Sequence, residues 1–386
     1  MITAATVAVS DAVDASWDAV VVGAGPAGSF AARELAICGR RVLLLDRQEF
    51  PRPKVCGGCL NGRTLALLDS VGLGGLPAAL GGQPLERFEL RAGGCPVELP
   101  MAAGMAVSRT ALDAALILSA IESGADFLPG TRATLGGTGP RYRQVRLPDH
   151  DQLLEARLVV VADGLGGSFL AGRSKYRSKP EANSRIGAGA EVLDPAGSYP
   201  AGVIHMAVDR SGYAGVAKVE GEMLSVAAAL DPHTVRSEGL AGAIGHLLAR
   251  RGLPPVDTAG AQWRGTAALT RRAPTVALER VFLIGDAAGY VEPFTGEGIS
   301  WALETARTAT SLAAQGIDDW QPDLIPRWRR LYRRRITQRQ RWCRTLAWGL
   351  RRPALMHAGA RLLGRAPRLA TPLMAHLNAT PAGERN

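Results

Sequence analysis

The sequence predicts an α/β fold, α+β overall, in which a parallel-sheet domain carries an inserted mixed or antiparallel sheet and a helical C-terminal segment. The apolar runs at 19–22 and 281–284 are rich in β-branched residues, and each ends at a glycine-containing turn, which is typical of buried parallel strands. Short apolar or alternating runs at 184–230, separated by Gly, Pro and Asp, predict the inserted sheet. Aromatic and aliphatic residues at near-helical spacing after residue 324 predict the C-terminal helices.

The first strand leads directly into residues 23–28, Gly-Ala-Gly-Pro-Ala-Gly, a G-x-G-x-x-G segment. Gly23 permits a tight turn, Gly25 lets the backbone approach a pyrophosphate, and Gly28 allows the following helix to pack closely on the strand. The next strand ends at Asp46, 18 residues after Gly28, where a carboxylate can accept hydrogen bonds from a ribose. Because the triplet stands between a strand and a helix, this unit predicts a Rossmann-like domain that binds a dinucleotide.

The second apolar run identifies the dinucleotide. It ends at Gly285 and Asp286, where a carboxylate can accept a hydrogen bond from a polyol hydroxyl. Gly296 and Gly298 expose backbone N–H groups at the start of a helix predicted at 300–313, which suits an electron-rich ring carbonyl. Nicotinamide cofactors have no ribityl chain that needs such an acid, whereas flavins do, so the two segments together predict FAD.

With these motifs the chain resembles the FAD-binding proteins of the glutathione-reductase-like superfamily, in the branch of aromatic hydroxylases, flavin halogenases and geranylgeranyl reductases. Residues 54–58 are similar to the Lys-x-Cys-Gly-Gly segment of the geranylgeranyl reductase group. Residues 107–113 are similar to the superfamily's Arg-x-x-Leu-Asp segment, and residues 158–164 to its strand and Asp-Gly turn. The resemblance extends from about residue 16 to residue 315 and covers most of the chain.

The resemblance implies six segments along the chain. They are 16–83 (the first FAD-binding segment), 84–105 (a segment of the substrate sheet), 106–175 (the second FAD-binding segment), 176–275 (the substrate domain), 276–320 (the third FAD-binding segment) and 321–386 (the basic helical segment).

The motifs and the resemblance together give a set of residues expected to contact FAD. Arg109 is expected near the adenosine diphosphate half, and Ile299 is expected to face the flavin ring with Gly296 and Gly298. The full set is Gly23, Gly25, Pro26, Ala27, Gly28, Asp46, Arg47, Gly57, Arg109, Ala133, Asp163, Gly164, Gly285, Asp286, Ala287, Pro293, Gly296, Glu297, Gly298 and Ile299.

Cys56 and Tyr213 are the predicted catalytic residues on the substrate side. In the reductase group the motif cysteine lies beside the flavin, and Tyr213 is the residue that this chain keeps of the group's Tyr-x-Trp-x-Phe-Pro stretch. Cys56 and Cys59 also resemble a redox dithiol. We see no second G-x-G-x-x-G segment of the kind flavin disulfide reductases carry, so we interpret Cys59 as a packing residue. No other Cys or His pair has zinc-site spacing, so no metal is expected.

We therefore expect an FAD-dependent oxidoreductase of the geranylgeranyl reductase-like group that acts by flavin hydride transfer on a hydrophobic isoprenoid, quinone or polyketide-like substrate. The chain lacks the Trp-x-Trp-x-Ile-Pro segment of halogenases and any constellation typical of a hydrolase. Two alternatives stay open: a monooxygenase that hydroxylates an aromatic or polyketide ring, and a membrane-associated electron-transfer flavoprotein. The electron donor is NAD(P)H or a separate protein.

The C-terminal segment is strongly basic. Residues 324–383 contain fourteen arginines, no lysine and no acid, in a chain of net charge +10. Three interpretations compete: a helical cap over the substrate domain, a peripheral membrane surface, and a nucleic-acid surface. No nucleic-acid partner is expected, because no recognised module is present.

The compartment follows from what the sequence lacks. No uncharged apolar stretch reaches the roughly 18 residues of a spanning helix. Residues 1–14 lack the pattern of a signal peptide and are predicted to form a loose extension. Five cysteines, an odd number, argue against a secreted disulfide framework. We expect a cytoplasmic protein, with peripheral membrane contact as an alternative.

Overall fold

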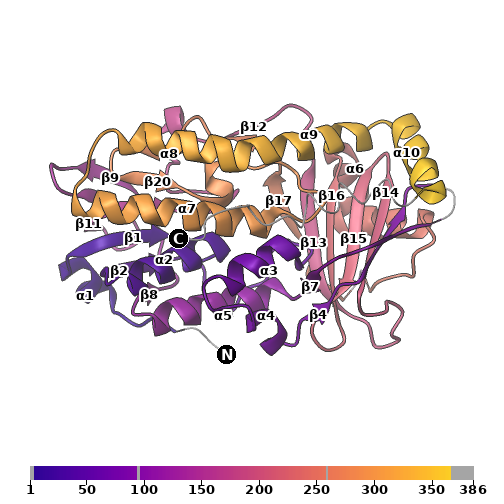
Figure 1. The fold of residues 1–386 in the computed structure, drawn as a ribbon, viewed down its shortest axis with the longest axis horizontal. Helices are drawn as coiled ribbons and strands as arrows, with labels where there is room; N and C mark the ends of the chain where they lie inside the picture. The colour runs from indigo at the N-terminus through magenta and orange to yellow at the C-terminus, as the bar shows by residue number, and fades with distance from the viewer. Residues whose placement is uncertain (1–3, 94–95, 258–259, 367–386) are drawn as a thin grey trace.

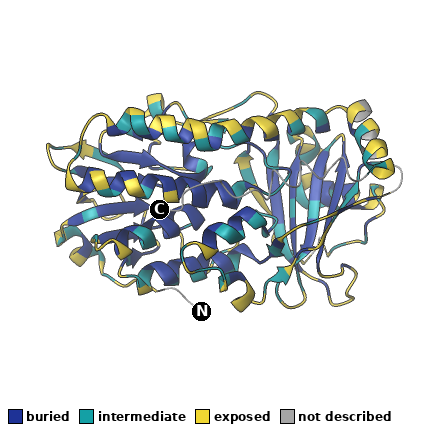
Figure 2. Ribbon diagram, in the orientation of Figure 1, coloured by how far each residue is buried: buried dark blue, intermediate teal, exposed yellow. Residues whose placement is uncertain are grey.

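The computed structural model describes residues 4–93, 96–257 and 260–366, so residues 367–386 of the predicted basic segment lie outside the described residues. Two sheets lie side by side, and a row of helices from the C-terminal third of the chain runs along both of them (Figure 1). Figure 2 shows that both sheets are largely buried.

The first sheet has eight strands, with the order β19-β20-β11-β1-β2-β8 and with β10 and β9 paired beyond β11. Its strands are β1 (Trp17–Val22), β2 (Val42–Leu45), β8 (Asp126–Leu128), β9 (Thr134–Thr138), β10 (Arg143–Leu147), β11 (Gln152–Val161), β19 (Ala277–Leu278) and β20 (Val281–Leu283). The central strands β20, β11, β1, β2 and β8 are parallel. Val22 lies opposite both Leu45 and Val161, and Val161 lies opposite Leu283. This register brings the ends of four strands to one edge of the sheet.

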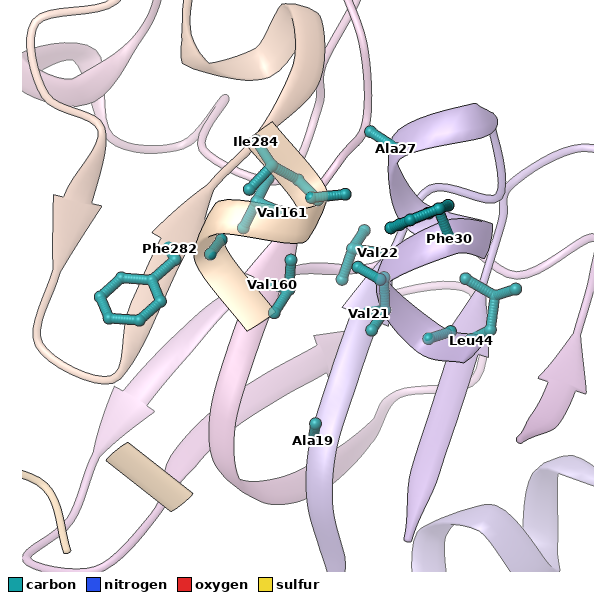
Figure 3. Packing of buried hydrophobic residues seen from close by; sticks show 14 of the residues in the cluster. Ala19, Val21, Val22, Ala27, Phe30, Leu44, Val160, Val161, Phe282 and Ile284 are labelled. Atoms are coloured by element: carbon teal, nitrogen blue, oxygen red, sulfur yellow. The ribbon is translucent and has the colours of Figure 1, made fainter. Parts of the chain in front are cut away.

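Helices cover this sheet. The helices that contact it are α1 (Val9–Asp14), α2 (Pro26–Ile37), α5 (Arg109–Glu122) and α7 (Gly298–Asp318), whereas α3 (Gly62–Asp69) packs on α7 and is followed by α4 (Leu76–Ala79). Helix α2 packs against α5, α7 and the central strands, and Figure 3 shows side chains of β1, β11 and α2 meeting in this core. The sequence predicts a helix from Ser29, and α2 begins three residues earlier because Pro26, which has no N–H to satisfy, suits the first helical position.

The second sheet has seven strands in the order β17-β13-β16-β15-β14-β5-β6. They are β5 (Arg87–Arg91), β6 (Val97–Pro100), β13 (Ile186–Leu193), β14 (Val203–Asp209), β15 (Gly212–Lys218), β16 (Met223–Leu230) and β17 (Arg264–Ala268). All pairs are antiparallel except β14 with β5, so the predicted mixed sheet is present. The division of the chain into six segments stays a prediction.

Helix α6 (Pro232–Arg250) packs on one face of this sheet through Ala243, Ile244 and Leu247. The apolar periodicity of the sequence predicts a helix only from Leu240, eight residues after α6 begins. Asp231 accepts a hydrogen bond from the His233 N–H and caps the helix, and the backbone of Gly239 is non-helical. The apolar periodicity starts only after this kink, so periodicity alone gave too late a start.

Short strands complete the sheet structure. Strands β3 (Cys59–Asn61), β7 (Gly104–Ala106) and β4 (Gln83–Pro84) form a small sheet, and β12 (Lys179–Pro180) pairs with β18 (Arg271–Arg272).

The C-terminal segment is helical over the residues that the structure describes: α8 (Leu324–Tyr332), a π-helical turn (Arg333–Thr337), α9 (Gln338–Leu350) and α10 (Pro353–Arg365). Trp328 is fully buried, and its indole N–H donates to the Val276 carbonyl at 3.0 Å. Trp342, on the same predicted apolar stripe, is 64% exposed. A π-helical turn changes the residues per turn and so rotates the stripe. None of the helices in the described ranges is long and apolar enough to cross a membrane.

Residues 4–14 are not the loose extension that the sequence predicted for residues 1–14, of which residues 1–3 lie outside the described residues. Ala12 is fully buried, and its carbonyl accepts a hydrogen bond from the Trp17 indole at 2.8 Å. The Thr6 N–H donates to the Phe127 carbonyl at 2.9 Å. Helix α1 has a single fully buried residue, and such a short apolar signal was too weak to find in the sequence.

The packing of α8 gives a stability prediction. Replacing Trp328 by Ala leaves a cavity beside Phe282 and Tyr332, and we expect the free energy of unfolding to fall by about 3–5 kcal/mol. Urea unfolding measures it, with the exposed Arg330→Ala as the control. Equal loss in both variants, or none in either, would contradict the assignment of α8 to the core.

Candidate functional site

A cavity of about 1180 Å³ runs from the strand ends of the first sheet, across one face of the second sheet, to α9 and α10. Except for Gly28 and Ala287, every predicted site residue lines it. The lining members are Gly23, Gly25, Pro26, Ala27, Asp46, Arg47, Cys56, Gly57, Arg109, Ala133, Asp163, Gly164, Tyr213, Gly285, Asp286, Pro293, Gly296, Glu297, Gly298 and Ile299. Their individual roles remain predictions.

The glycine-rich turn has the shape that a diphosphate needs. Gly23 has φ +105°, and a Cβ there would lie 2.4 Å from the Ala162 carbonyl oxygen. A Cβ on Gly28 would lie 1.7 Å from the Gly23 carbonyl oxygen, so Gly28 serves packing, behind the cavity wall. A Cβ on Gly25 would meet only the Arg109 guanidinium, at 3.9 Å. Gly25 therefore faces open space at the start of α2, where no side chain caps the free N–H groups.

Asp46 is fixed at the end of β2. It is buried, and one carboxylate oxygen accepts from the Ala24 N–H at 2.8 Å. The other accepts from the Gln48 N–H at 2.9 Å, and Arg52 lies 3.6 Å away. The carboxylate thus ties the glycine turn to the next strand, and each of its oxygens keeps acceptor capacity for a ribose hydroxyl.

Arg109 begins α5, which Ser108 caps by accepting a hydrogen bond from the Ala111 N–H. Its guanidinium binds Asp113 through two hydrogen bonds of 2.7 and 2.8 Å, and both side chains are buried. Burial alone would lower the pKa of the Arg109 guanidinium, but the charge of Asp113 and its hydrogen bonds raise it. The Arg109 guanidinium is therefore charged, and its two hydrogen bonds to Asp113 fix its position. Asp113 was not among the predicted site residues, although it ends the Arg-x-x-Leu-Asp segment at helical i, i+4 spacing.

Two predicted acids, Asp163 and Asp286, are half-buried in the cavity. Burial raises the pKa of the Asp163 carboxyl to about 6, although the Phe169 N–H donates to it at 2.9 Å. Burial also raises the pKa of the Asp286 carboxyl, while the charges of Lys54 and Arg109 oppose that shift. Nearby cations stabilise the ionised form of both carboxyls.

Lys54 is a cavity residue that sequence reasoning did not single out. Burial, and then the charges of Arg109 and Arg52, lower the pKa of its ammonium group. None of the described carboxylates lies within ion-pair distance of it, and Asp286 acts on it only at longer range. A buried charge without a partner is costly, so an anionic ligand is expected beside it. This ammonium and the open cradle at Gly25 together fit the diphosphate of a dinucleotide. The sequence feature that could have identified Lys54 as a site residue is its place in the Lys-x-Cys-Gly-Gly segment.

The Cys-Gly-Gly segment is held against the second sheet, because the Ser225 hydroxyl donates to the Cys56 carbonyl at 3.0 Å. Cys59 also lines the cavity, and its interpretation as a packing residue stays a prediction. Its thiol donates to the Gly57 carbonyl at 3.2 Å. Burial and then Cys56 raise the pKa of the Cys59 thiol to about 12. A thiol that stays protonated is a poor nucleophile, which argues against dithiol redox chemistry.

Tyr213 presents its ring to the cavity. The ring lies edge-to-face with Phe294 at 5.0 Å, and the Arg185 guanidinium lies 5.6 Å from its centroid. Burial and the negative charge of Glu292 raise the pKa of the Tyr213 hydroxyl. Glu292 is fully buried and binds Arg185 at 3.0 Å. Neither Glu292 nor Arg185 was predicted, because only the folded chain brings residues 107 positions apart together.

The segment 293–299 joins the cavity to the C-terminal helices. The Cys343 thiol of α9 donates to the buried Glu297 carboxylate at 2.9 Å. Tyr290 lies between these elements, with its hydroxyl 3.0 Å from where a Cβ on Gly298 would be. Cys343 and Tyr290 both line the cavity, and neither was among the predicted site residues. Among the described ranges, no three His, Cys, Asp or Glu side chains come together as metal ligands.

Comparison with known proteins bears on this site. Residues 16–209 match the family described as FAD binding domain. The chain is 33% identical to menaquinone reductase from Mycolicibacterium smegmatis, over 78% of this chain and 76% of that protein. It is 30% identical to digeranylgeranylglycerophospholipid reductase 2 from Methanothermobacter thermautotrophicus, over 83% of this chain and 84% of that protein.

A solved structure agrees with the fold. A geranylgeranyl bacteriochlorophyll reductase-like protein from Thermoplasma acidophilum superposes with a TM-score of 0.75 at 18% identity, covering 94% of this chain and 95% of that one.

The open space at Gly25 can be tested directly. Gly25 has an ordinary φ of −76°, so Gly25→Val changes only the volume at the start of α2, and we expect the purified variant to lose most of its FAD. Gly172→Val is the control, because a Cβ there meets no atom within 4 Å. Flavin absorbance per protein measures the FAD content. Normal FAD content in Gly25→Val would contradict the proposal that the diphosphate binds at Gly25.

The charge at Lys54 gives a second prediction. Lys54→Met removes the unpartnered ammonium, and we expect FAD to bind about tenfold more weakly. The control is the exposed Lys179→Met. Titration of the FAD-free proteins with FAD, followed by flavin fluorescence, gives the dissociation constants. Equal constants for the two variants would show that Lys54 does not face the cofactor.

Proposed function

This chain belongs to the FAD-dependent oxidoreductases of the geranylgeranyl reductase-like group, and on this premise we propose that it reduces a carbon–carbon double bond of an isoprenoid chain carried by a quinone or another lipid. Its relatives named above are reductases of menaquinone and of a geranylgeranyl phospholipid.

One observation carries this proposal: beyond the predicted FAD segments the cavity has an apolar wall. The acids that line the whole cavity are Asp46, Asp163, Asp286 and Glu297, all within those segments. The far wall consists of strands of the second sheet and of α9 and α10. Its larger apolar members include Phe88, Leu90, Leu99, Ile204, Met206 and Leu350, and its charged members are Arg264 of β17 and Arg339 of α9. Such a surface favours a hydrocarbon chain over a polar molecule.

The protein has three tasks in this reaction. FAD, when bound, supplies the hydride chemistry. Lys54, Arg109 and the start of α2 would hold the diphosphate, and the N–H groups at the start of α7 would face the ring. The apolar wall keeps water out. Cys56 lines the cavity and interacts with the Arg109 guanidinium, and its carbonyl accepts a hydrogen bond from the Ser225 hydroxyl.

The reaction class is tested by anaerobic stopped-flow absorbance of the FAD-loaded protein. The flavin is reduced with NADPH, NADH or dithionite and then mixed with menaquinone or a geranylgeranyl lipid. We expect flavin reoxidation coupled to substrate saturation. A long-lived oxygen adduct on mixing with air, with an oxygenated product, would instead establish a monooxygenase. Reoxidation by the quinone headgroup with the isoprenoid chain unchanged would establish electron transfer.

Cys56 gives a further prediction. We expect Cys56→Ser to keep its FAD and to turn over substrate at least fivefold more slowly, because the smaller, more polar hydroxyl replaces the thiol beside the apolar wall. The matched control is the exposed Cys38→Ser. Unchanged steady-state kinetics in Cys56→Ser would assign Cys56 to packing alone.

We also propose that the arginine-rich C-terminal segment contacts a membrane, since an isoprenoid lipid resides in one.

A further inference from the structure

The rim of the cavity, formed by α9 and α10, exposes several large apolar side chains. Among the described residues, seven large apolar side chains are highly exposed. Four of them lie on α9 and α10: Trp342 (64%), Trp348 (53%), Leu355 (49%) and Leu362 (55%). Single exposed apolar residues are ordinary, but a cluster marks an interaction surface. Figure 2 shows the exposed outward surfaces of both helices.

The exposed cluster continues into the cavity. Trp342, Trp348 and Leu355 line the cavity as well as reaching the surface, and Met356 and Leu363 of α10 line it farther in. An apolar path therefore leads from the surface to the wall that the proposed substrate would contact.

The charges around this rim have one sign. Residues 338–366 contain seven arginines and no Asp, Glu or Lys. Arg341, Arg361 and Arg365 are exposed. The Arg352 guanidinium lies 3.5 Å from the Trp348 ring centroid, which places a cation directly over an exposed aromatic face.

The rim is held in place by ion pairs to the body of the protein. Arg344 of α9 binds Glu181 at 2.6 Å, and Arg351 lies 3.4 Å from the buried Glu292 carboxylate. These contacts tie the middle of α9 and the residue after it to the body of the protein.

We propose that the α9–α10 rim docks on an anionic lipid bilayer, and that the lipid substrate passes from the bilayer into the cavity between these helices. The inference rests on the proposed function for the identity of the substrate. Tryptophan and leucine beside arginine are the residues that favour the interface of an anionic membrane. A bilayer fits better than an acidic protein, because a protein seated on the rim would close the apolar path.

The rest of the basic segment supplies an internal comparison. Helix α8 and the turn after it also carry exposed arginines, including Arg330 and Arg334, but no large exposed apolar side chain. Positive charge alone attracts an anionic membrane weakly and inserts no side chain into it. The α8 surface is therefore expected to contribute little to membrane binding. In Figure 1, α8 and α10 lie at opposite ends of the row of helices.

Flotation of the full-length, FAD-loaded protein tests the docking without any substrate. The vesicles are phosphatidylcholine alone, or phosphatidylcholine with phosphatidylglycerol, at physiological salt. We expect flotation with the anionic vesicles and at least tenfold weaker binding of Arg361→Gln/Leu362→Gln/Arg365→Gln, none of which lines the cavity. Arg330→Gln/Arg334→Gln, the control on charge alone, should change binding less than twofold. FAD content and melting temperature show that both variants are folded.

Three flotation results would overturn the proposal: no flotation of the unaltered protein, equal binding to neutral and anionic vesicles, or unchanged binding of the triple variant. If the unaltered protein does not float and sedimentation shows dimers, the rim is an interface with a second copy of the chain.

Turnover separates this proposal from the proposed function. We expect the triple variant to reduce a short-chain, water-soluble substrate at the normal rate, and a vesicle-embedded one at least tenfold more slowly. Normal turnover of both substrates despite lost vesicle binding would overturn the passage from the bilayer. Vesicle binding by a protein that reduces neither substrate would support docking and refute the proposed function.

Discussion

The parallel register of β20, β11, β1 and β2 is the constraint on which the rest of the structure depends. Because Val22 lies beside Leu45 and Val161, and Val161 beside Leu283, the four strands end at one edge. Segments far apart in the sequence, around Gly25 and Asp286, therefore line one cavity. Without this alignment each motif would be a glycine-containing turn with no common ligand.

The same cavity changes character along its length. Its cofactor end holds the four lining acids together with Lys54 and with Arg109, whose charge Asp113 balances. Its far end is apolar and is closed by the second sheet and the C-terminal helices. Glu297 and Cys343 connect the two ends, because the segment at the start of α7 packs directly on α9. The basic segment thus contributes to the cavity wall.

The sequence predicted those features of the site that depend on local backbone geometry. Gly23 and Gly28 could be found because a Cβ at either position would overlap a carbonyl oxygen a few residues or one strand away. The strands of the second sheet could be found from their alternation. Glu292 and Tyr290 could not, because their roles depend on distances between segments that no periodicity records. The early start of α6 had a signal in Asp231, but a kink separates that cap from the apolar stripe.

The central claim is that an isoprenoid double bond is reduced in the apolar half of this cavity. Mass spectrometry of the product after a single anaerobic turnover, with one equivalent of reduced protein, tests it most directly. The account predicts that the isoprenoid chain gains two hydrogens while the headgroup is unchanged. A product with an added oxygen atom, or a reduced headgroup on an unsaturated chain, would contradict it.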